Sequence, residues 1–145
     1  MKKKSGHLIP TAELVRKVPF FSNLAPDAVV DLTSMLRRLE LPPRATVVEK
    51  DAPGDCMYFI ASGEVEVELP GRKIPLTQGS FFGELALLSN SVRTATVVTR
   101  TDTTLLVLDL VAFRTLMARH HDLAAAIDLE ARRRTRENLQ RSKAQ

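Results

Sequence analysis

The sequence predicts an α+β fold, an antiparallel β-roll or jelly roll of about eight short strands with helices at its N-terminal and C-terminal ends. Three observations predict it. Apolar residues recur at helical spacing before Pro42, alternate with polar residues through the middle of the chain, and return to helical spacing after Asp109. A small roll is the expected arrangement, because closure of this kind protects the edges of short antiparallel strands.

Residues 11–39 predict the N-terminal helices. The first helix spans Thr11–Val18 and is stopped by Pro19, because the residue before a proline avoids the helical region. The second begins at Pro26, since proline is favoured in the first turn of a helix. Its apolar side chains recur at mostly helical spacing as far as Leu39.

The residue pattern over 44–108 predicts the β-roll. Six stretches within them are rich in β-forming residues and are separated by turn-forming pairs such as Ser62-Gly63 and Pro70-Gly71. In one stretch, glutamate alternates strictly with valine or leucine, which predicts one solvated face and one buried face. The six predicted strands are Thr46–Glu49, Met57–Ala61, Glu64–Leu69 (the alternating one), Ile74–Thr77, Thr94–Thr99 and Thr103–Leu108.

Residues 109–142 predict the C-terminal helices. Asp109 and Asp122 are placed to cap one helix each, because an aspartate side chain accepts a hydrogen bond from the first helical turn. The length of the chain falls within the single-domain range, so we expect one domain over residues 1–145. A narrow apolar stripe on the second helix precedes turns rich in arginine; it consists of Leu123, Ile127 and Ala131.

The formal charge of +4 at pH 7 points at first to a polyanionic partner, but its distribution does not. Residues 1–18 carry a net +4 and residues 128–145 a net +3, so the 109 residues between them carry a net −3. A basic surplus confined to the two ends predicts no specific binding of nucleic acid. Binding of nucleic acid by these ends would depend steeply on salt.

Catalytic residues, metal ligands and a cofactor are not expected. His7, His120 and His121 have no metal-ligand spacing with one another or with Cys56, and no Ser-His-Asp set or Walker-type loop occurs. The sequence has no apolar run of the ~18 residues that a membrane span needs, and its start lacks the apolar stretch of a signal peptide. We therefore expect a cytoplasmic chain that is not an enzyme.

The segment 81–97 contains a pattern suited to a bound phosphate. Gly83 permits a sharp turn, and the N–H groups of a helical turn beginning at Glu84 favour an anion. Arg93 stands at the entry to the next strand, directly before the small residues Thr94 and Ala95. Backbone amides, small side chains and one arginine are together what a single phosphate needs. The carboxylate of Glu84 belongs beside a phosphate only if it accepts a hydrogen bond, and a sugar hydroxyl is the obvious donor.

The runs Phe82–Leu87 and Arg93–Ala95 resemble the phosphate-binding cassette of the cyclic nucleotide-binding domain family. That family includes kinase regulatory subunits, cyclic-nucleotide-gated channels and catabolite-activator-type regulators. The resemblance covers Val18–Asp128 and extends to the runs Gly54–Ile60 and Ser62–Val65. It implies a β-roll that binds cAMP or cGMP as a ligand.

The resemblance also implies a role for each residue of the cassette. Arg93 would hold the cyclic phosphate, and Glu84 would hold the ribose 2′-hydroxyl. Thr94 would be able to reach the amino group of a syn guanine. Thus cGMP remains a candidate ligand, with cAMP modestly favoured. Backbone amides would complete the anion site, with Gly83 allowing their approach; they belong to Leu85, Ala86, Thr94 and Ala95.

The C-terminal helix is implied to be a lid that closes over the base. Arg134, with Arg133 as its neighbour, is the side chain expected over the purine, and a solvated helix face is the alternative for this arginine run. The resemblance further implies a regulatory domain attached to a membrane transport protein, a bacterial ion channel or a cation/proton antiporter. The alternative function keeps the fold and drops the ligand, as a scaffold or protein-interaction domain.

Overall fold

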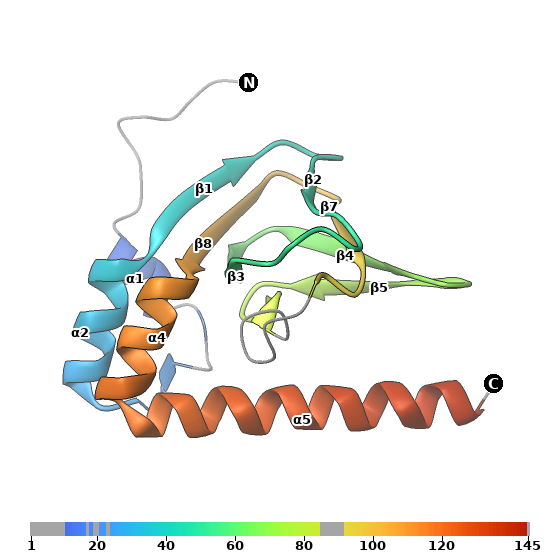
Figure 1. Cartoon of the computed structure of the whole chain (residues 1–145). Helices are drawn as coiled ribbons and strands as arrows, with labels where there is room; N and C mark the ends of the chain where they lie inside the picture. The colour runs from blue at the N-terminus through green and yellow to red at the C-terminus, as the bar shows by residue number, and fades with distance from the viewer. Residues whose placement is uncertain (1–10, 17, 19–20, 23, 85–91, 145) are drawn as a thin grey trace.

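The computed structural model describes residues 11–16, 18, 21–22, 24–84 and 92–144. Within these residues, two four-stranded antiparallel sheets form the middle of the chain (Figure 1). Eight strands in this described part, together with helices at both ends, confirm the predicted β-roll. In spatial order, the first sheet consists of β1 (Arg37–Leu41), β8 (Thr103–Asp109), β3 (Cys56–Ser62) and β6 (Phe81–Phe82), and the second of β2 (Thr46–Val48), β7 (Thr96–Thr99), β4 (Glu64–Leu69) and β5 (Arg72–Thr77).

The first sheet separates two hydrophobic cores. Successive side chains of a strand point to opposite faces, so the two neighbouring phenylalanines of β6 enter different cores. Phe81 packs with Phe59 in the core that faces the helices, and Phe82 packs with Tyr58 and Ile60 in the core between the two sheets. The core between the sheets is therefore the interior of the roll.

The helices α1 (Thr11–Arg16), α2 (Pro26–Met35) and α4 (Leu110–Arg119) lie together at one end of the roll, and α5 (His121–Ala144) runs beneath it (Figure 1). The side chain of Asp109 accepts a hydrogen bond from the backbone N–H of Ala112 at 2.9 Å, which confirms the predicted cap of α4. The predicted apolar stripe on α5 is buried; it consists of Leu123, Ile127 and Ala131. In the described part of the chain, no helix is both long enough and apolar enough to cross a membrane.

The second N-terminal helix is shorter than its spacing predicted, and the prediction that it reaches Leu39 is wrong. Helix α2 ends at Met35, and Leu36 is already extended, with φ −79° and ψ 140°. Strand β1 then pairs with β8, from Arg37 opposite Val107 to Leu41 opposite Thr103. Pairing with a strand distant in sequence satisfies the backbone of Arg37–Leu41, so the roll begins before the predicted residue 44.

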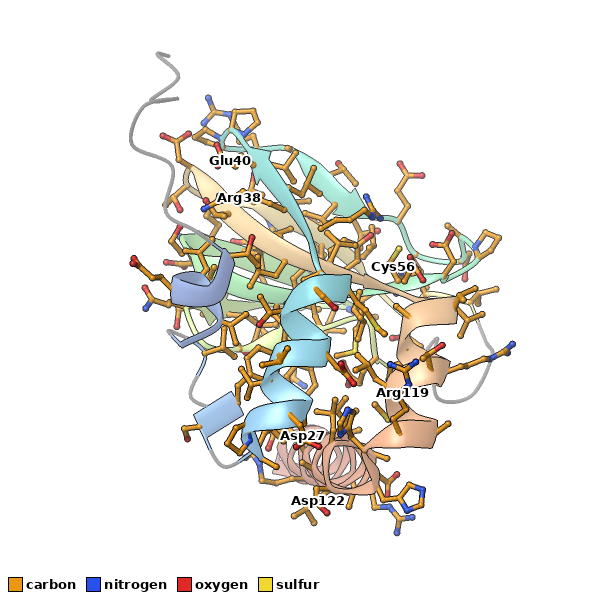
Figure 2. The ribbon with its side chains drawn as sticks, turned by 90° about the vertical axis from the view of Figure 1, so that its left-hand side faces the viewer. Asp27, Arg38, Glu40, Cys56, Arg119 and Asp122 are labelled. Carbon is orange, nitrogen blue, oxygen red and sulfur yellow. The ribbon has the colours of Figure 1, made fainter. Side chains whose placement is uncertain are left out.

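The second C-terminal helix begins two residues earlier than predicted, since a cap at Asp122 would make Leu123 the first helical residue. Because α5 starts at His121, Asp122 lies in the first turn of the helix, not at its N-cap. The difference is small, since helix boundaries vary by one or two residues. Figure 2 looks along α5 and shows Asp122 on this helix beneath α2 and α4.

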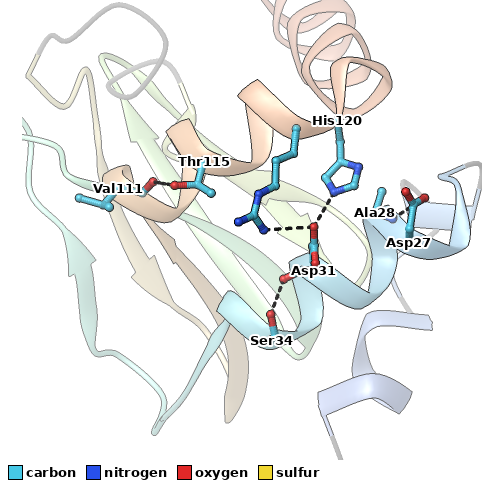
Figure 3. Close-up of polar contacts among 8 residues, drawn as sticks. Asp27, Ala28, Asp31, Ser34, Val111, Thr115 and His120 are labelled. Carbon is cyan, nitrogen blue, oxygen red and sulfur yellow. Dashed lines mark hydrogen bonds and ion pairs between the residues drawn. The ribbon is translucent and has the colours of Figure 1, made fainter.

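A polar cluster ties the junction of α4 and α5 to α2. Asp31 on α2 accepts a hydrogen bond from Nε2 of His120 at 2.7 Å, and its carboxylate lies 3.5 Å from Nη1 of Arg119 (Figure 3). The hydrogen bond from His120 is the main cause that lowers the pKa of Asp31 below its ordinary value of 3.8. His120 is the residue between the two helices, so the contact holds the point at which the chain changes direction.

Candidate functional site

Gly83, directly after β6, brings the backbone close to the side chain of Arg93. Its φ of +87° lies in the region that L side chains rarely adopt. A Cβ at this position would lie 2.8 Å from Nη1 of Arg93 and 3.2 Å from the carbonyl oxygen of Cys56. Glycine is therefore required twice, for the backbone conformation and for the space that the guanidinium occupies.

The guanidinium of Arg93 is buried against two backbone carbonyls. Arg93 is only 6% exposed; Nη1 donates to the carbonyl oxygen of Gly83 at 3.1 Å, and Nη2 donates to that of Cys56 at 2.8 Å. A guanidinium carries five N–H donors and a permanent positive charge, and these two bonds engage neutral acceptors. The arrangement orients a buried cation without a carboxylate in either bond, which suits a bound anion.

The backbone of Arg93 is fixed by the turn between β2 and β3. Its N–H donates to the carbonyl oxygen of Ala52, and its carbonyl accepts from the N–H of Asp51, both at 2.9 Å. An isolated bridge between Pro53 and Val92 continues the pairing. Both the main chain and the side chain of Arg93 are thus held in place within the folded domain.

Two aromatic rings lie beside the guanidinium. The Cζ atom of Arg93 is 5.7 Å from the ring centroid of Tyr58, within the distance of a cation–π contact. Tyr58 stacks on Phe82 with centroids 5.0 Å apart and an interplanar angle of 13°. Burial raises the pKa of the Tyr58 phenol above its ordinary value of 10.0, so the ring is neutral at physiological pH.

Glu84 places a carboxylate next to the glycine turn. The residue is 4% exposed, which is rare for a glutamate, because a buried carboxylate needs hydrogen-bond donors. It follows Gly83 directly and has a helical conformation. The site therefore combines a buried acceptor and a buried cation within one short stretch of chain.

The structure brings together part of the predicted set. Gly83 and Arg93 are in contact, Ala95 is buried close to Arg93 in the chain, and Thr94 between them is exposed. Leu85 and Ala86 lie outside the described residues.

The two arginines predicted to cover a base lie on α5. Arg133 is exposed and donates to the carboxylate of Glu130 on the same helix, with Nε 3.0 Å from Oε1. The side chain of Arg134 lies outside what the structure describes. The predicted role of these two residues stays a prediction.

Three contributors to the site were missed by the sequence interpretation. The carbonyls of Cys56 and Ala52 act through the backbone, which leaves no side-chain signal in a sequence. Tyr58 did leave a signal, because it alternates with Met57 and Phe59 in a strand and therefore faces the other side of the sheet.

The fold and the surroundings of Arg93 define a class of protein, a small β-roll with a buried arginine that is oriented by two backbone carbonyls. Comparison with protein families gives the particular family. The model of the cyclic nucleotide-binding domain matches residues 38–120, and the chain belongs to this family.

Curated relatives agree with that assignment. The chain is 38% identical over 130 residues to a putative potassium channel protein of Rhodopseudomonas palustris, and the match covers 87% of this chain and 32% of the relative. It is 37% identical over 115 residues to a cyclic nucleotide-gated potassium channel of Rhizobium etli, with 79% of this chain and 32% of the channel covered. The chain thus spans about a third of the length of these relatives.

Solved structures show the same fold. The catabolite activator protein of Thermus thermophilus is 30% identical with a TM-score of 0.75, and the match covers 86% of this chain and 62% of that one. A structure of PKAR CBD2 with bound Sp-2Cl-cAMPS has a TM-score of 0.74 at 20% identity and covers 88% of both chains. The second likeness concerns the fold alone.

Proposed function

We propose that this chain binds a cyclic nucleotide, cAMP or cGMP, and acts as a regulatory sensor domain. The observation that carries the proposal is the guanidinium of Arg93, which is buried beside Gly83 and oriented by two backbone carbonyls. A cyclic nucleotide carries one phosphate charge, which one buried arginine matches. The family of the chain supports the same ligand class, as does its 37% identity to a relative named as a cyclic nucleotide-gated potassium channel.

Each residue of the site binds a different part of the ligand. Arg93 binds the cyclic phosphate, and Glu84 accepts a hydrogen bond from the ribose 2′-hydroxyl. Thr94 is exposed and is therefore available to a guanine amino group. For this reason cGMP remains a candidate ligand, although cAMP is modestly favoured. Backbone amides complete the phosphate site, and Gly83 allows their approach; they belong to Leu85, Ala86, Thr94 and Ala95.

Regulation follows from closure of α5 over the base. The ligand shifts an equilibrium between open and closed arrangements only by its difference in affinity for the two. Arg133 and Arg134 are the lid side chains in this proposal, and Arg133 would exchange its contact with Glu130 for the purine. No cofactor and no metal ion takes part.

The chain regulates a membrane transport protein in this proposal, and it lies on the cytoplasmic side. Two relatives are named as potassium channels, and the chain spans about a third of their length. That share leaves room in such a protein for a transport domain. An ion channel is therefore the first choice of parent, and a cation/proton antiporter is the second.

Titration calorimetry with cAMP and with cGMP tests the proposal. A phosphate and a guanidinium ~4 Å apart attract each other by about 4 kcal/mol at an effective dielectric near 20, before desolvation is subtracted. We expect Arg93→Ala to weaken binding by roughly 2–4 kcal/mol, or about 30- to 700-fold.

Arg100→Ala is the matched control, because the Arg100 side chain is half exposed and its ion pairs with Glu64 and Glu66 lie outside the site. It should leave the dissociation constant unchanged. A wild-type chain that binds neither nucleotide would refute the proposed function and favour the scaffold alternative. An unchanged dissociation constant in Arg93→Ala would remove Arg93 from the phosphate site.

A further inference from the structure

The two carbonyls that orient Arg93 lie at the start of one strand of the first sheet and directly after the end of another. Cys56 begins β3, and Gly83 directly follows β6. Strand β6 has two residues and, among the described residues, pairs only with β3, through Tyr58 opposite Phe82 and Phe59 opposite Phe81. The spacing of the two acceptors therefore depends on how a very short edge strand is held against β3.

The stacked rings of Tyr58 and Phe82 hold that pairing from inside the roll. They occupy directly opposite positions of the two strands, with centroids 5.0 Å apart. Cross-strand aromatic pairs of this kind stabilise the strands that carry them. Because Phe82 precedes Gly83 and Tyr58 lies two residues after Cys56, each ring is close in the chain to one of the two acceptors.

The Tyr58 ring also contacts the guanidinium itself. The Cζ atom of Arg93 lies 5.7 Å from its centroid, inside the limit of about 6 Å for an attractive contact with a ring face. The carbonyls of Gly83 and Cys56 accept hydrogen bonds from the guanidinium, and the ring provides a third contact. Three contacts on a planar group restrict both its position and its orientation.

We propose that Tyr58 is a positioning residue, whose ring holds β6 against β3 and fixes the guanidinium of Arg93 before a ligand arrives. The role at the ligand rests on the proposed function; the positioning of Arg93 does not. The aromatic ring carries the effect and the phenolic hydroxyl does not. A ligand then meets an arginine that is already in place, so less freedom is lost on binding.

Three variants separate positioning from general packing. Tyr58→Phe keeps the ring, and Tyr58→Leu replaces it with an apolar side chain. Leu105→Val perturbs the same core of the roll at a fully buried residue that is not part of the site. Thermal unfolding of each variant measures the accompanying change in stability.

The first measurement uses no ligand. In nitrogen-15 spectra of the arginine side chains, the guanidinium signals of Arg93 are identified by their loss in Arg93→Lys. A guanidinium over a ring face has proton shifts displaced by the ring current. We expect this displacement in the wild type, in Tyr58→Phe and in Leu105→Val, and we expect its loss in Tyr58→Leu. An undisplaced wild-type signal would overturn the proposal, even if Tyr58→Leu failed to fold.

The second measurement is the titration of each variant with cAMP. We expect Tyr58→Leu to weaken binding roughly three- to tenfold, and Tyr58→Phe and Leu105→Val to bind as the wild type does. Equal losses in Tyr58→Leu and Leu105→Val, or a loss in Tyr58→Phe as large as that in Tyr58→Leu, would contradict the positioning role. If the wild type binds neither cAMP nor cGMP, the proposed function fails, and the ligand-free spectra still decide the role of Tyr58.

Discussion

Substitution of Gly83 by alanine separates the function of this glycine from its backbone conformation, because the chain contains a matched glycine outside the site. Gly83 has φ +87°, and Gly71, in the turn between β4 and β5, has φ +77°. An added Cβ at Gly71 meets nothing within 4 Å, whereas at Gly83 it meets Nη1 of Arg93 at 2.8 Å. The two alanine variants therefore share a conformational cost and differ in the contacts of the added Cβ, which at Gly83 also lies 3.2 Å from the carbonyl oxygen of Cys56.

The expected magnitudes follow from these distances. A left-handed conformation costs an L residue roughly 1–2 kcal/mol, so both variants lose about this much stability. At Gly83, the nearest atom is the end of a flexible side chain, which can move aside, and the carbonyl oxygen of Cys56 at 3.2 Å has to shift by a few tenths of an ångström, so the further loss of stability is small. That side chain is the proposed phosphate ligand, and hydrogen bonds to charged groups contribute about 1.5–3 kcal/mol each. Displacement of the guanidinium should therefore weaken cAMP binding tenfold or more.

Urea unfolding and calorimetric titration with cAMP measure the two quantities on each variant. We expect Gly83→Ala and Gly71→Ala to unfold at similar urea concentrations, and only Gly83→Ala to lose affinity. Wild-type affinity in Gly83→Ala would refute the close approach of Gly83 and Arg93 as a requirement of the site. A parallel loss of affinity in Gly71→Ala would show that the effect arises from stability alone.

Two further predictions concern the helices. Asp31→Asn should lower the urea midpoint at pH 7 and reduce the loss of stability in acid. Because the pKa of Asp31 in the folded chain lies below 3.8, the carboxylate contributes its full stabilisation of the fold above pH 3.8. This stabilisation disappears as the pH falls through the lower pKa of the folded state. Equal acid sensitivity of variant and wild type in urea unfolding at several pH values would contradict this. Asp109→Ala removes the cap of α4 and should lower the free energy of unfolding by about 1 kcal/mol. Asp109→Asn should retain most of the stability, because asparagine also caps helices. Equal urea midpoints of the two variants would exclude a capping role for Asp109.

The end of α2 shows where residue spacing could not predict the fold. Leu36 and Leu39 fit a helical spacing, and the strand formed by Arg37–Leu41 offers only a short alternation. The choice between helix and strand depends on β8, which is distant in the sequence and provides the hydrogen bonds. By contrast, the limits of Glu64–Leu69 were predicted as observed, because its strict alternation has the period of a strand alone.

The site also has features that the sequence could predict and features that it could not. The left-handed backbone at Gly83 was predictable, because a sharp turn of this kind favours glycine, whereas the phosphate-binding role of Arg93 stays a prediction. The acceptors of the guanidinium were not predictable, since the carbonyl of Cys56 is the same for every residue type. The contact of Arg93 with Tyr58 depends on the pairing of β3 with β6, and a two-residue strand such as β6 is too short to show a period.

The contact of Asp31 with His120 lies at the N-terminal end of the long helix α5. Helix α5 has 24 residues, and at a rise of 1.5 Å per residue it extends about 36 Å from the junction. A rotation of about 10° at His120 would displace the far end of such a helix by roughly 6 Å. A small rotation at the junction of α4 and α5 is therefore amplified along α5 into a movement comparable to one helical turn at its C-terminal end.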